Sequence, residues 1–429
     1  MVSMQEKIAL NGSHFIQQVG MTFFTQMVCV LFSVANAAIV ARCLGPEGKG
    51  LLALVLLIPN MLGIFLNGGI GIANVYLAGS GRQDISTLVT NSVTFACIAT
   101  VIGIGVITSL IATSWLEVWM PGVPVWLLCL ATLGFPTGIL NIYFSTILQG
   151  LQHIAKINKI NLLQAALTLC LTFLFVSNLG LGIVGALVAY LGAGSISVII
   201  MGLILKQMGG SLTPTWNPKI AQITLLFGIK GHIGNVLQYF NYRLDMFFVN
   251  YFLGPGGVGI YSVSVGLAEL LWYFPNAVGF VIFPKAASSK PIMMNIFTPR
   301  VFRLTFGLTA FGAILLGFIG KLLIEMIFSS SFNSAFIPMV ALLPGVVFQG
   351  GTKVLANDIA GRGYPQYNSL GAGIGVILTV LMDLLLIPRY GVLGAALAST
   401  VAYGVIFLNT LCFHWIVSRR TETVHLGEL

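Results

Sequence analysis

The sequence carries charged side chains inside long apolar runs, where lipid rather than water would surround them. They are Lys230, Arg243, Asp245, Glu269 and Lys353. A charge at the centre of a membrane costs at least ~2.5–3.5 kcal/mol on insertion scales, so its presence predicts a function. Because an ammonium group binds phosphate as a point charge, Lys230 and Lys353 would suit an anionic ligand.

We predict two roles for these five residues. Lys230, Lys353 and Arg243 are candidate ligand-binding cations, although Arg243 lies on a different side of its helix from Lys230 and could pair elsewhere. Asp245 and Glu269 could bind H⁺ or Na⁺ and so couple an ion gradient to transport. Helix positions alone do not show which of these side chains touch one another.

Uncharged polar residues also recur along single faces of the apolar runs. For any one of them, hydrogen bonding between packed helices is the favoured interpretation. Lipid cannot solvate whole stripes, so we predict that the stripes line a hydrated cavity. Two further carboxylates, Asp358 and Asp383, lie near predicted helix ends and are interpreted as structural partners. The predicted lining residues are Gln18, Thr22, Gln26, Asn36, Asn60, Asn67, Gln238, Asn241 and Asn276.

The composition requires a membrane protein. Of 429 residues, only 7% are charged, against roughly 25% in a soluble domain. The formal net charge of +9 could suggest nucleic acid, but the basic residues lie singly between apolar runs and are interpreted as topology signals. The sequence contains no nucleotide-binding or metalloprotease motif and no metal-ligand spacing of Cys. It therefore predicts no catalytic residue, no cofactor and no bound metal.

Twelve apolar segments reach the ~20 residues that a membrane-spanning helix needs. We predict an all-α integral membrane fold, with twelve transmembrane helices in two pseudo-symmetric six-helix lobes around a central cavity. The N-terminal lobe is predicted at residues 1–210 and the C-terminal lobe at residues 211–429. The segments lie near 15–41, 50–78, 86–113, 123–148, 155–177, 183–205, 221–251, 257–283, 299–320, 335–360, 367–387 and 391–417.

A short motif marks an internal repeat. The segment 44–50 (LGPEGKG) recurs as 253–259 (LGPGGVG), and 182–189 is echoed by 391–398. Pro fixes φ and removes a donor while Gly accepts positive φ, so each copy of the motif predicts a turn between two helices. Six helices per half make the repeats parallel, an architecture that secondary transporters use. We interpret the turns as pivots or packing corners rather than as ligand sites.

The loops predict the orientation of the chain. Lys and Arg concentrate in alternate loops, and the opposite loops hold only Arg42, Lys49, Lys321 and Arg389. The positive-inside rule therefore predicts that both termini are cytoplasmic.

The ordered motifs resemble a known family. Asp245 is followed by 251–254 (YFLG) and 258–263 (VGIYSV), and the first apolar run leads into 39–50 (IVARCLGPEGKG). Together they resemble the polysaccharide-biosynthesis flippases of the multidrug/oligosaccharidyl-lipid/polysaccharide superfamily, which includes the bacterial O-antigen flippases. The resemblance covers the whole chain, since length, helix count and repeat all fit, although each motif is short and apolar.

The resemblance implies a function. Such proteins carry undecaprenyl-diphosphate-linked oligosaccharides, the repeat units of O-antigen, capsule or exopolysaccharide, from the cytoplasmic to the outer leaflet of the bacterial plasma membrane. It implies alternating access driven by H⁺ or Na⁺, with a polysaccharide polymerase and a chain-length regulator as partners. Family members use cationic cavity residues for the diphosphate, which agrees with Lys230 and Lys353 without identifying them. Asp245 matches a recurrent acidic position, where the first half has Asn36.

Two alternatives stay open. A multidrug or small-metabolite cation antiporter of the same fold would favour a more apolar, aromatic cavity with a lone acidic cation site. A non-transporting scaffold of a polysaccharide synthesis complex is disfavoured by the polar stripes. The chain has two helices fewer than the fourteen-helix lipid II flippases of the superfamily, which weakens the case for a peptidoglycan precursor as substrate.

Overall fold

A computed structural model describes residues 4–81, 83–289 and 291–426, with side chains from 21 to 419 except at 82, 230, 231, 288 and 290. Every element of secondary structure in these residues is helical, so the predicted all-α class is confirmed. Ten segments are long and apolar enough to cross a membrane. The prediction of a multi-pass membrane protein is therefore confirmed.

Two of these segments are much longer than one crossing requires. Met21–Leu66 has 46 residues and His232–Ala287 has 56, against the ~20 of a single span. Each contains one glycine with non-helical backbone angles, Gly45 and Gly254. The predicted count of twelve helices requires both segments to cross twice, and it stays a prediction.

The chain forms two compact units whose limits differ from the predicted lobes. Both α1 (Met4–Leu66) and α9 (Pro218–Glu269) contribute to both units. The lobe limits at 1–210 and 211–429 stay a prediction. The first unit comprises Met1–Leu44, Val55–Thr113 and Pro124–His232, and the second comprises Gly45–Leu54, Ser114–Val123 and Ile233–Leu429.

In the first unit, α6 (Phe135–Gly150) packs mainly against three other helices. These are α2 (Ile70–Gly79), α3 (Ile85–Ala112) and α8 (Gly182–Gln207), and α8 also packs on α7 (Ile154–Thr172). Apolar side chains at helical spacing on α6 are buried against these helices and form part of the core of the first unit. The shorter elements are α5 (Val125–Thr132) and η1 (Phe173–Asn178).

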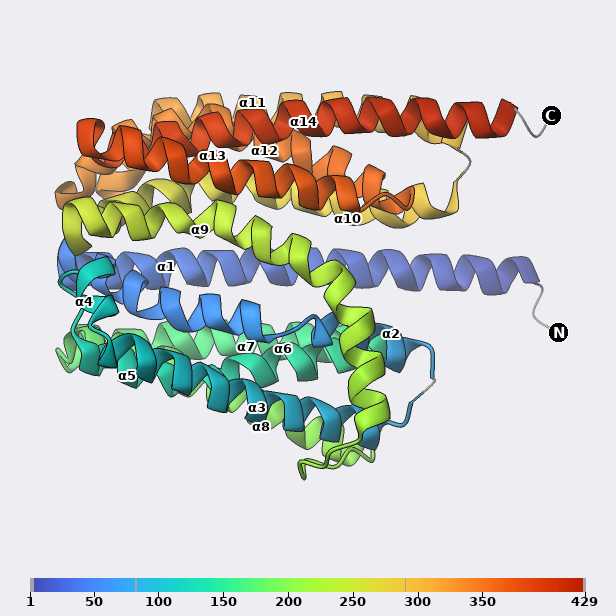
Figure 1. Cartoon of the computed structure of the whole chain (residues 1–429), viewed down its shortest axis with the longest axis horizontal. Coiled ribbons are helices and arrows are strands. Elements are labelled where there is room, and N and C mark those ends of the chain that lie inside the picture. Colours follow the sequence, from blue (N-terminus) through green and yellow to red (C-terminus); the bar gives the residue numbers. More distant parts are fainter. Residues whose placement is uncertain (1–3, 82, 290, 427–429) are drawn as a thin grey trace. The chain divides into compact units, whose positions relative to one another are not determined.

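In the second unit, α12 (Phe336–Gly361) packs against α10 (Tyr273–Ser288), α11 (Pro291–Ile327) and α14 (Val392–Leu426). The helix α13 (Gln366–Tyr390) packs mainly on α14. Figure 1 shows these yellow, orange and red helices running side by side. The shorter elements are α4 (Trp115–Trp119), η2 (Leu270–Trp272) and η3 (Ser330–Ala335).

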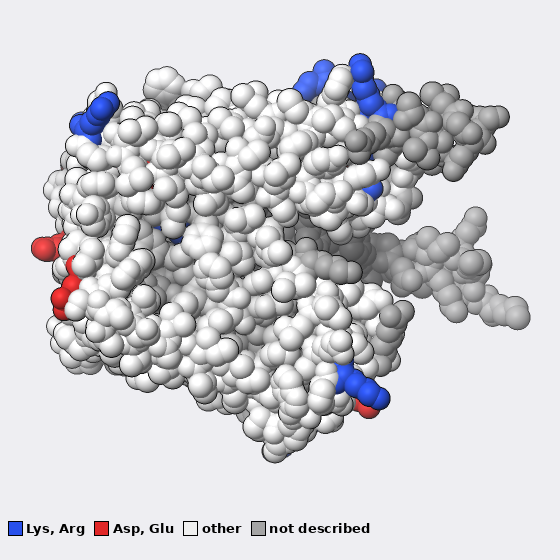
Figure 2. All heavy atoms as spheres, viewed as in Figure 1, with Lys and Arg blue, Asp and Glu red and all other residues white. Residues whose placement is uncertain are grey.

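The surface of both units suits lipid. Large apolar side chains such as Phe24, Val101 and Phe318 are 69%, 72% and 81% exposed. Figure 2 shows a face with very few charged side chains, most of them near its left and right margins. An apolar surface of this extent is rare on soluble monomers, whereas a bilayer covers it with hydrocarbon tails.

The two copies of the turn motif share one backbone conformation. Gly45 has φ 68° and ψ −175°, and Gly254 has φ 72° and ψ −176°. These angles are strained for residues with a Cβ, so glycine is required at both positions. Pro46 and Pro255 follow, at the start of a helix, where the missing N–H removes no hydrogen bond. Both predicted turns are confirmed.

The two turns also touch each other within the second unit. A Cβ on Gly50 would overlap the carbonyl oxygen of Pro255, and a Cβ on Gly259 would overlap that of Pro46. Only glycine allows this backbone-to-backbone approach. The result agrees with the interpretation of the turns as packing corners.

Candidate functional site

The carboxylate of Asp245 in α9 is deeply buried, with the residue only 1% exposed. The hydroxyl of Tyr261 donates a hydrogen bond to Oδ2, and the hydroxyl of Ser399 donates to the same oxygen at 3.2 Å. The backbone N–H of Met246 donates to Oδ1 at 2.8 Å. These donors satisfy both oxygens but are neutral. The one charge that attracts this carboxylate among the described side chains is the Arg243 guanidinium, which is itself paired with Glu269.

A second carboxylate, Asp383 of α13, lies close enough to Asp245 for the two charges to interact. Asp383 is 0% exposed, and among the described residues neither of its carboxylate oxygens has a hydrogen-bond partner. Thr379 lies one turn before Asp383, and Asn241 lies one turn before Asp245. Each has a buried side-chain oxygen that lacks a hydrogen-bond partner among the described residues. The amide nitrogen of Asn241 donates to the carbonyl of Ala372 at 2.8 Å and ties α9 to α13.

Unsatisfied buried oxygens of this kind require a partner. Burying an uncompensated carboxylate costs several kcal/mol, and two neighbouring carboxylates also repel each other. A shared proton or a small hard cation would relieve both costs, since hard cations take carboxylate, hydroxyl and amide oxygens as ligands. We call this group the carboxylate cluster and treat it as a candidate cation site. It consists of Asn241, Asp245, Tyr261, Thr379, Asp383 and Ser399.

Lys353 of α12 lies against two aromatic rings. Its Nζ is 5.3 Å from the ring centroid of Tyr242 and 4.8 Å from that of Trp272. Gln349 donates to the Tyr242 hydroxyl at 2.9 Å, and the Trp272 indole donates to the carbonyl of Val346 at 3.0 Å, so both rings are fixed. No described carboxylate lies within 4.0 Å of the Lys353 Nζ. The rings hold the ammonium without neutralising it, so it can bind an anion.

Arg243 and Glu269 form a two-point ion pair. Their NH1–Oε1 and NH2–Oε2 distances are 2.9 and 3.0 Å, and the side chains are 28% and 21% exposed. The pair joins the two parts of α9 on either side of the break at Gly254. This structure therefore brings together a predicted binding cation and a predicted ion-coupling residue. Both roles stay predictions.

The other predicted residues have varied surroundings. Gln18 and Lys230 belong to helical backbone, but their side chains lie outside the described ones. Thr22 accepts a hydrogen bond from Asn158 at 2.8 Å, which is a contact between helices of the first unit. The exposed residues are Gln26, Asn60 and Asn276. The half-buried residues, each with one buried polar atom lacking a partner among the described residues, are Asn36, Asn67 and Gln238.

Sequence reasoning misses several members of the carboxylate cluster. It predicts a structural role for Asp383 and no role for Thr379, yet their spacing of four inside an apolar run is a signal for one polar helix face. Tyr261 lies within the motif that carries the family resemblance. Ser399 follows a run of small apolar residues, where nothing in the sequence distinguishes it from a helix-packing residue.

Comparison with known proteins decides the family. A sequence model described as "Polysaccharide biosynthesis protein" matches residues 39–337, which is more than half of the chain. The chain belongs to this polysaccharide biosynthesis protein family. The match includes Asp245, Tyr261 and the Arg243–Glu269 pair, while Lys353, Asp383 and Ser399 lie beyond it.

Three relatives of this family member have been compared along the chain. It is 25% identical to an uncharacterised membrane protein of Methanocaldococcus jannaschii over 65% of this chain and 58% of that one. It is 23% identical to a candidate low-salt glycan biosynthesis flippase of Haloferax volcanii over 61% of this chain and 55% of that one. The chain therefore spans less than two thirds of these two relatives. A candidate O-antigen transporter of Shigella flexneri is 21% identical over 92% of this chain and 96% of that one.

Solved structures support the fold of this family member. An inward-facing multidrug resistance transporter of the MATE family has a TM-score of 0.76 at 15% identity, covering 92% of this chain and 96% of that one. The lipid II flippase MurJ in an inward closed conformation has a TM-score of 0.73 at 15% identity, covering 96% and 93%. At this identity the likeness shows a shared fold only.

The ion pair of this family member gives a first testable prediction. Glu269→Gln or Arg243→Gln alone should lower the free energy of unfolding by about 1–3 kcal/mol, because each leaves a partly buried charge unpaired. The double variant should lose less free energy of unfolding than the two single variants lose together. Thermal unfolding in detergent measures both, with the exposed Glu325→Gln as a control that should change little. Strictly additive effects would show that the two charges do not interact.

Proposed function

We propose that the protein is a secondary transporter that moves a polyprenyl-diphosphate-linked oligosaccharide from the cytoplasmic to the outer leaflet of the membrane. The family and two of the compared relatives support a substrate of polysaccharide synthesis. The observation that carries the proposal is Lys353, an ammonium inside a membrane-spanning segment that aromatic rings hold without a described carboxylate partner. A diphosphate is the kind of ligand that such a charge binds.

The carboxylate cluster is the proposed site of ion coupling, with H⁺ or Na⁺ as the ion. Tyr403 provides a physical connection between this cluster and Lys353. Its hydroxyl donates to the backbone carbonyl of Asn241 at 3.4 Å, while its ring lies edge-on to Tyr242 and Trp272 at 6.1 and 5.9 Å. A shift of Asn241 on cation binding would therefore be passed to the aromatic side chains beneath Lys353.

The proposed location is the cytoplasmic membrane of a prokaryotic cell, with both termini on the cytoplasmic side. This orientation rests on the distribution of Lys and Arg between alternate loops. A polysaccharide polymerase and a chain-length regulator stay predicted partners, and Lys230 stays a predicted second cation.

Deleting the gene tests the function, and Lys353 tests the site. Deletion should abolish surface polysaccharide and cause lipid-linked repeat units to accumulate on the cytoplasmic side. Wild type should restore the glycan, whereas Lys353→Ala should reduce it about tenfold or more, since a charge-assisted hydrogen bond contributes about 1.5–3 kcal/mol. Glycan labelling and immunoblotting of the membrane fraction measure the outcome.

Lys285→Ala is a matched control, because Lys285 also lies over an aromatic ring, Phe297, with its Nζ 3.5 Å from the centroid. Unchanged surface glycan after deletion, in a strain without a second flippase, would contradict the function. Normal complementation by Lys353→Ala would contradict only the assigned role of that residue.

A multidrug or small-metabolite antiporter is the second candidate. The aromatic group of Tyr242, Trp272 and Tyr403 beside one acidic cluster is the pattern expected for it. Under this alternative, deletion would sensitise cells to cationic drugs and leave the surface glycan unchanged.

A further inference from the structure

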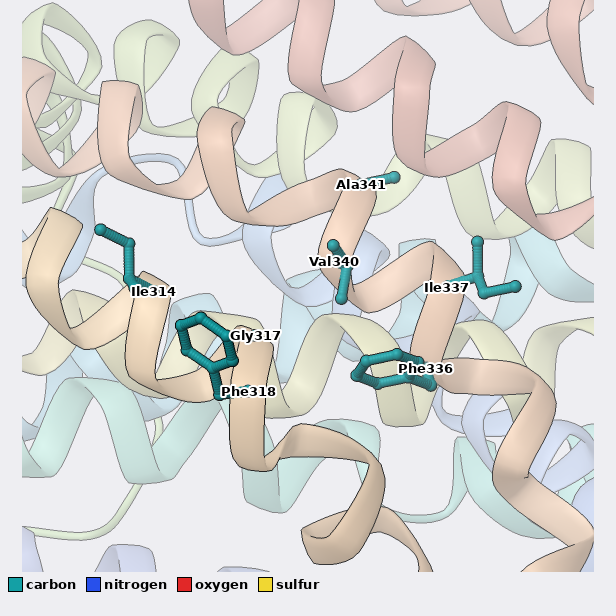
Figure 3. Close-up of a pocket in the computed structure, with 7 residues that line it drawn as sticks. All are labelled: Ile314, Gly317, Phe318, Phe336, Ile337, Val340 and Ala341. Atoms are coloured by element: carbon teal, nitrogen blue, oxygen red, sulfur yellow. The ribbon is translucent and has the colours of Figure 1, made fainter.

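A groove of about 430 Å³ lies between α11 and α12 in the second unit. Figure 3 shows Phe318 of α11 on one side of the gap between the two helices, and Phe336 and Val340 of α12 on the other. All the lining side chains are apolar: Ile314, Gly317, Phe318, Phe336, Ile337, Val340 and Ala341.

Both walls of this groove belong to membrane-spanning segments, Pro291–Ile327 and Ser330–Gly361. Phe318 is 81% and Ile337 is 62% exposed, so the rest of the described chain does not cover them. Because the surrounding medium is hydrocarbon, the occupant of the groove must itself present hydrocarbon.

Lys321 lies on α11 one helical turn beyond the groove residue Gly317. Lys321 follows Gly317 by four residues and Phe318 by three, so all three share one face of α11. Lys321 is exposed, and no described carboxylate lies within 4.0 Å of its Nζ, including that of Glu325 one turn further on. A lysine at this position extends its ammonium towards the headgroup region. An apolar groove with an unpaired positive charge one helical turn beyond it is complementary to a lipid with an anionic headgroup.

We propose that this groove holds the isoprenoid chain of a polyprenyl diphosphate in the outer leaflet, with the diphosphate against Lys321. The inference rests on the proposed function and on the orientation inferred from the loops. A diphosphate bears more negative charge than the single phosphodiester of a phospholipid, so a lone ammonium favours it. Two aromatic side walls also offer more contact area to a methyl-branched chain than aliphatic walls would. The groove thus retains the carrier beside the transporter once its glycan has crossed.

Native mass spectrometry of the full-length protein in detergent tests this site, with undecaprenyl diphosphate and phosphatidylglycerol as separate probes. Gly317→Leu fills the groove, and a Cβ there meets only the Leu343 side chain, at 3.6 Å. Lys321→Gln removes the charge from an exposed position and should therefore leave the fold intact. Wild type should retain undecaprenyl diphosphate in preference to phosphatidylglycerol. Each variant should bind undecaprenyl diphosphate about tenfold more weakly.

Ile319→Trp is the matched control, because Ile319 is 39% exposed, lies close to Gly317 along the helix and points to the opposite side of α11. It should bind undecaprenyl diphosphate as wild type does. Unchanged binding in both groove variants, or equal retention of phosphatidylglycerol, overturns the inference even if gene deletion abolishes surface glycan. Unchanged surface glycan after deletion would instead overturn the proposed function, whatever the binding result.

Discussion

Asp245→Asn and Asp383→Asn should each abolish transport while leaving the amount of protein in the membrane unchanged. Both substitutions keep the shape of the side chain and remove the charge that a cation would neutralise. In Asp245→Asn the amide oxygen can keep the hydrogen bond from the Met246 N–H, while the hydroxyls of Tyr261 and Ser399 can rotate to accept from the amide nitrogen, so the packing around it should survive. Surface glycan should fall to the level of the deletion strain. Asp84→Asn is the control, since Asp84 is exposed and its side chain caps no helix.

The same variants identify the coupling ion. If Na⁺ binds the carboxylate cluster of the folded protein, adding Na⁺ should raise the melting temperature of wild type. At a Na⁺ concentration one hundred times Kd, the free energy of unfolding should rise by about 2.7 kcal/mol. Asp245→Asn and Asp383→Asn should remove this response. No response to Na⁺ in wild type, with transport that depends on a proton gradient, would assign H⁺ to the cluster. Normal transport by either variant would contradict its role in coupling.

Gly259→Ala should destabilise the protein strongly. Its Cβ would overlap the carbonyl oxygen of Pro46, and a backbone atom cannot move aside as a flexible side chain can. We expect a loss of about 3 kcal/mol or more in the free energy of unfolding, seen as a lower melting temperature in detergent and less protein in the membrane. Gly50→Ala should behave alike, because its Cβ would meet the carbonyl of Pro255.

Gly256→Ala supplies the comparison for this prediction. Gly256 lies in the same turn with no heavy atom within 4 Å of an added Cβ. Alanine there should be neutral or stabilise by about 0.5–1 kcal/mol, because it restricts the unfolded chain and favours helix. Equal melting temperatures for Gly256→Ala and Gly259→Ala would show that the two turns do not pack as closely as the structure indicates.

Local chemistry explains which features the sequence predicts. Gly and Pro determine backbone angles by themselves, so the turns at Gly45 and Gly254 follow directly from residue type. The lipid environment makes any charge conspicuous, which singles out Asp245 and Lys353. These inferences need no knowledge of neighbouring helices.

Pairing between helices could not be predicted in the same way. Helical periodicity gives the face on which a side chain lies but not what lies opposite. The ion pair of Arg243 with Glu269 depends on how α9 folds back after Gly254, and the approach of Asp383 to Asp245 depends on how α13 packs on α9. The apolar groove beside Lys321 carries no polar signal at all, since each of its residues is typical of a lipid-facing helix.

The contact between the turns has a consequence for dividing the chain. The second compact unit includes Gly45–Leu54 and Ser114–Val123, which come from the first half of the sequence. A fragment that starts at residue 211 would lack both segments and would leave the backbone around Gly259 without its partner. Expression of residues 211–429 alone would therefore yield a second compact unit that lacks two of its segments. If the two halves were expressed separately, function would return only if these two segments of the first half packed against the second half as they do in the intact chain.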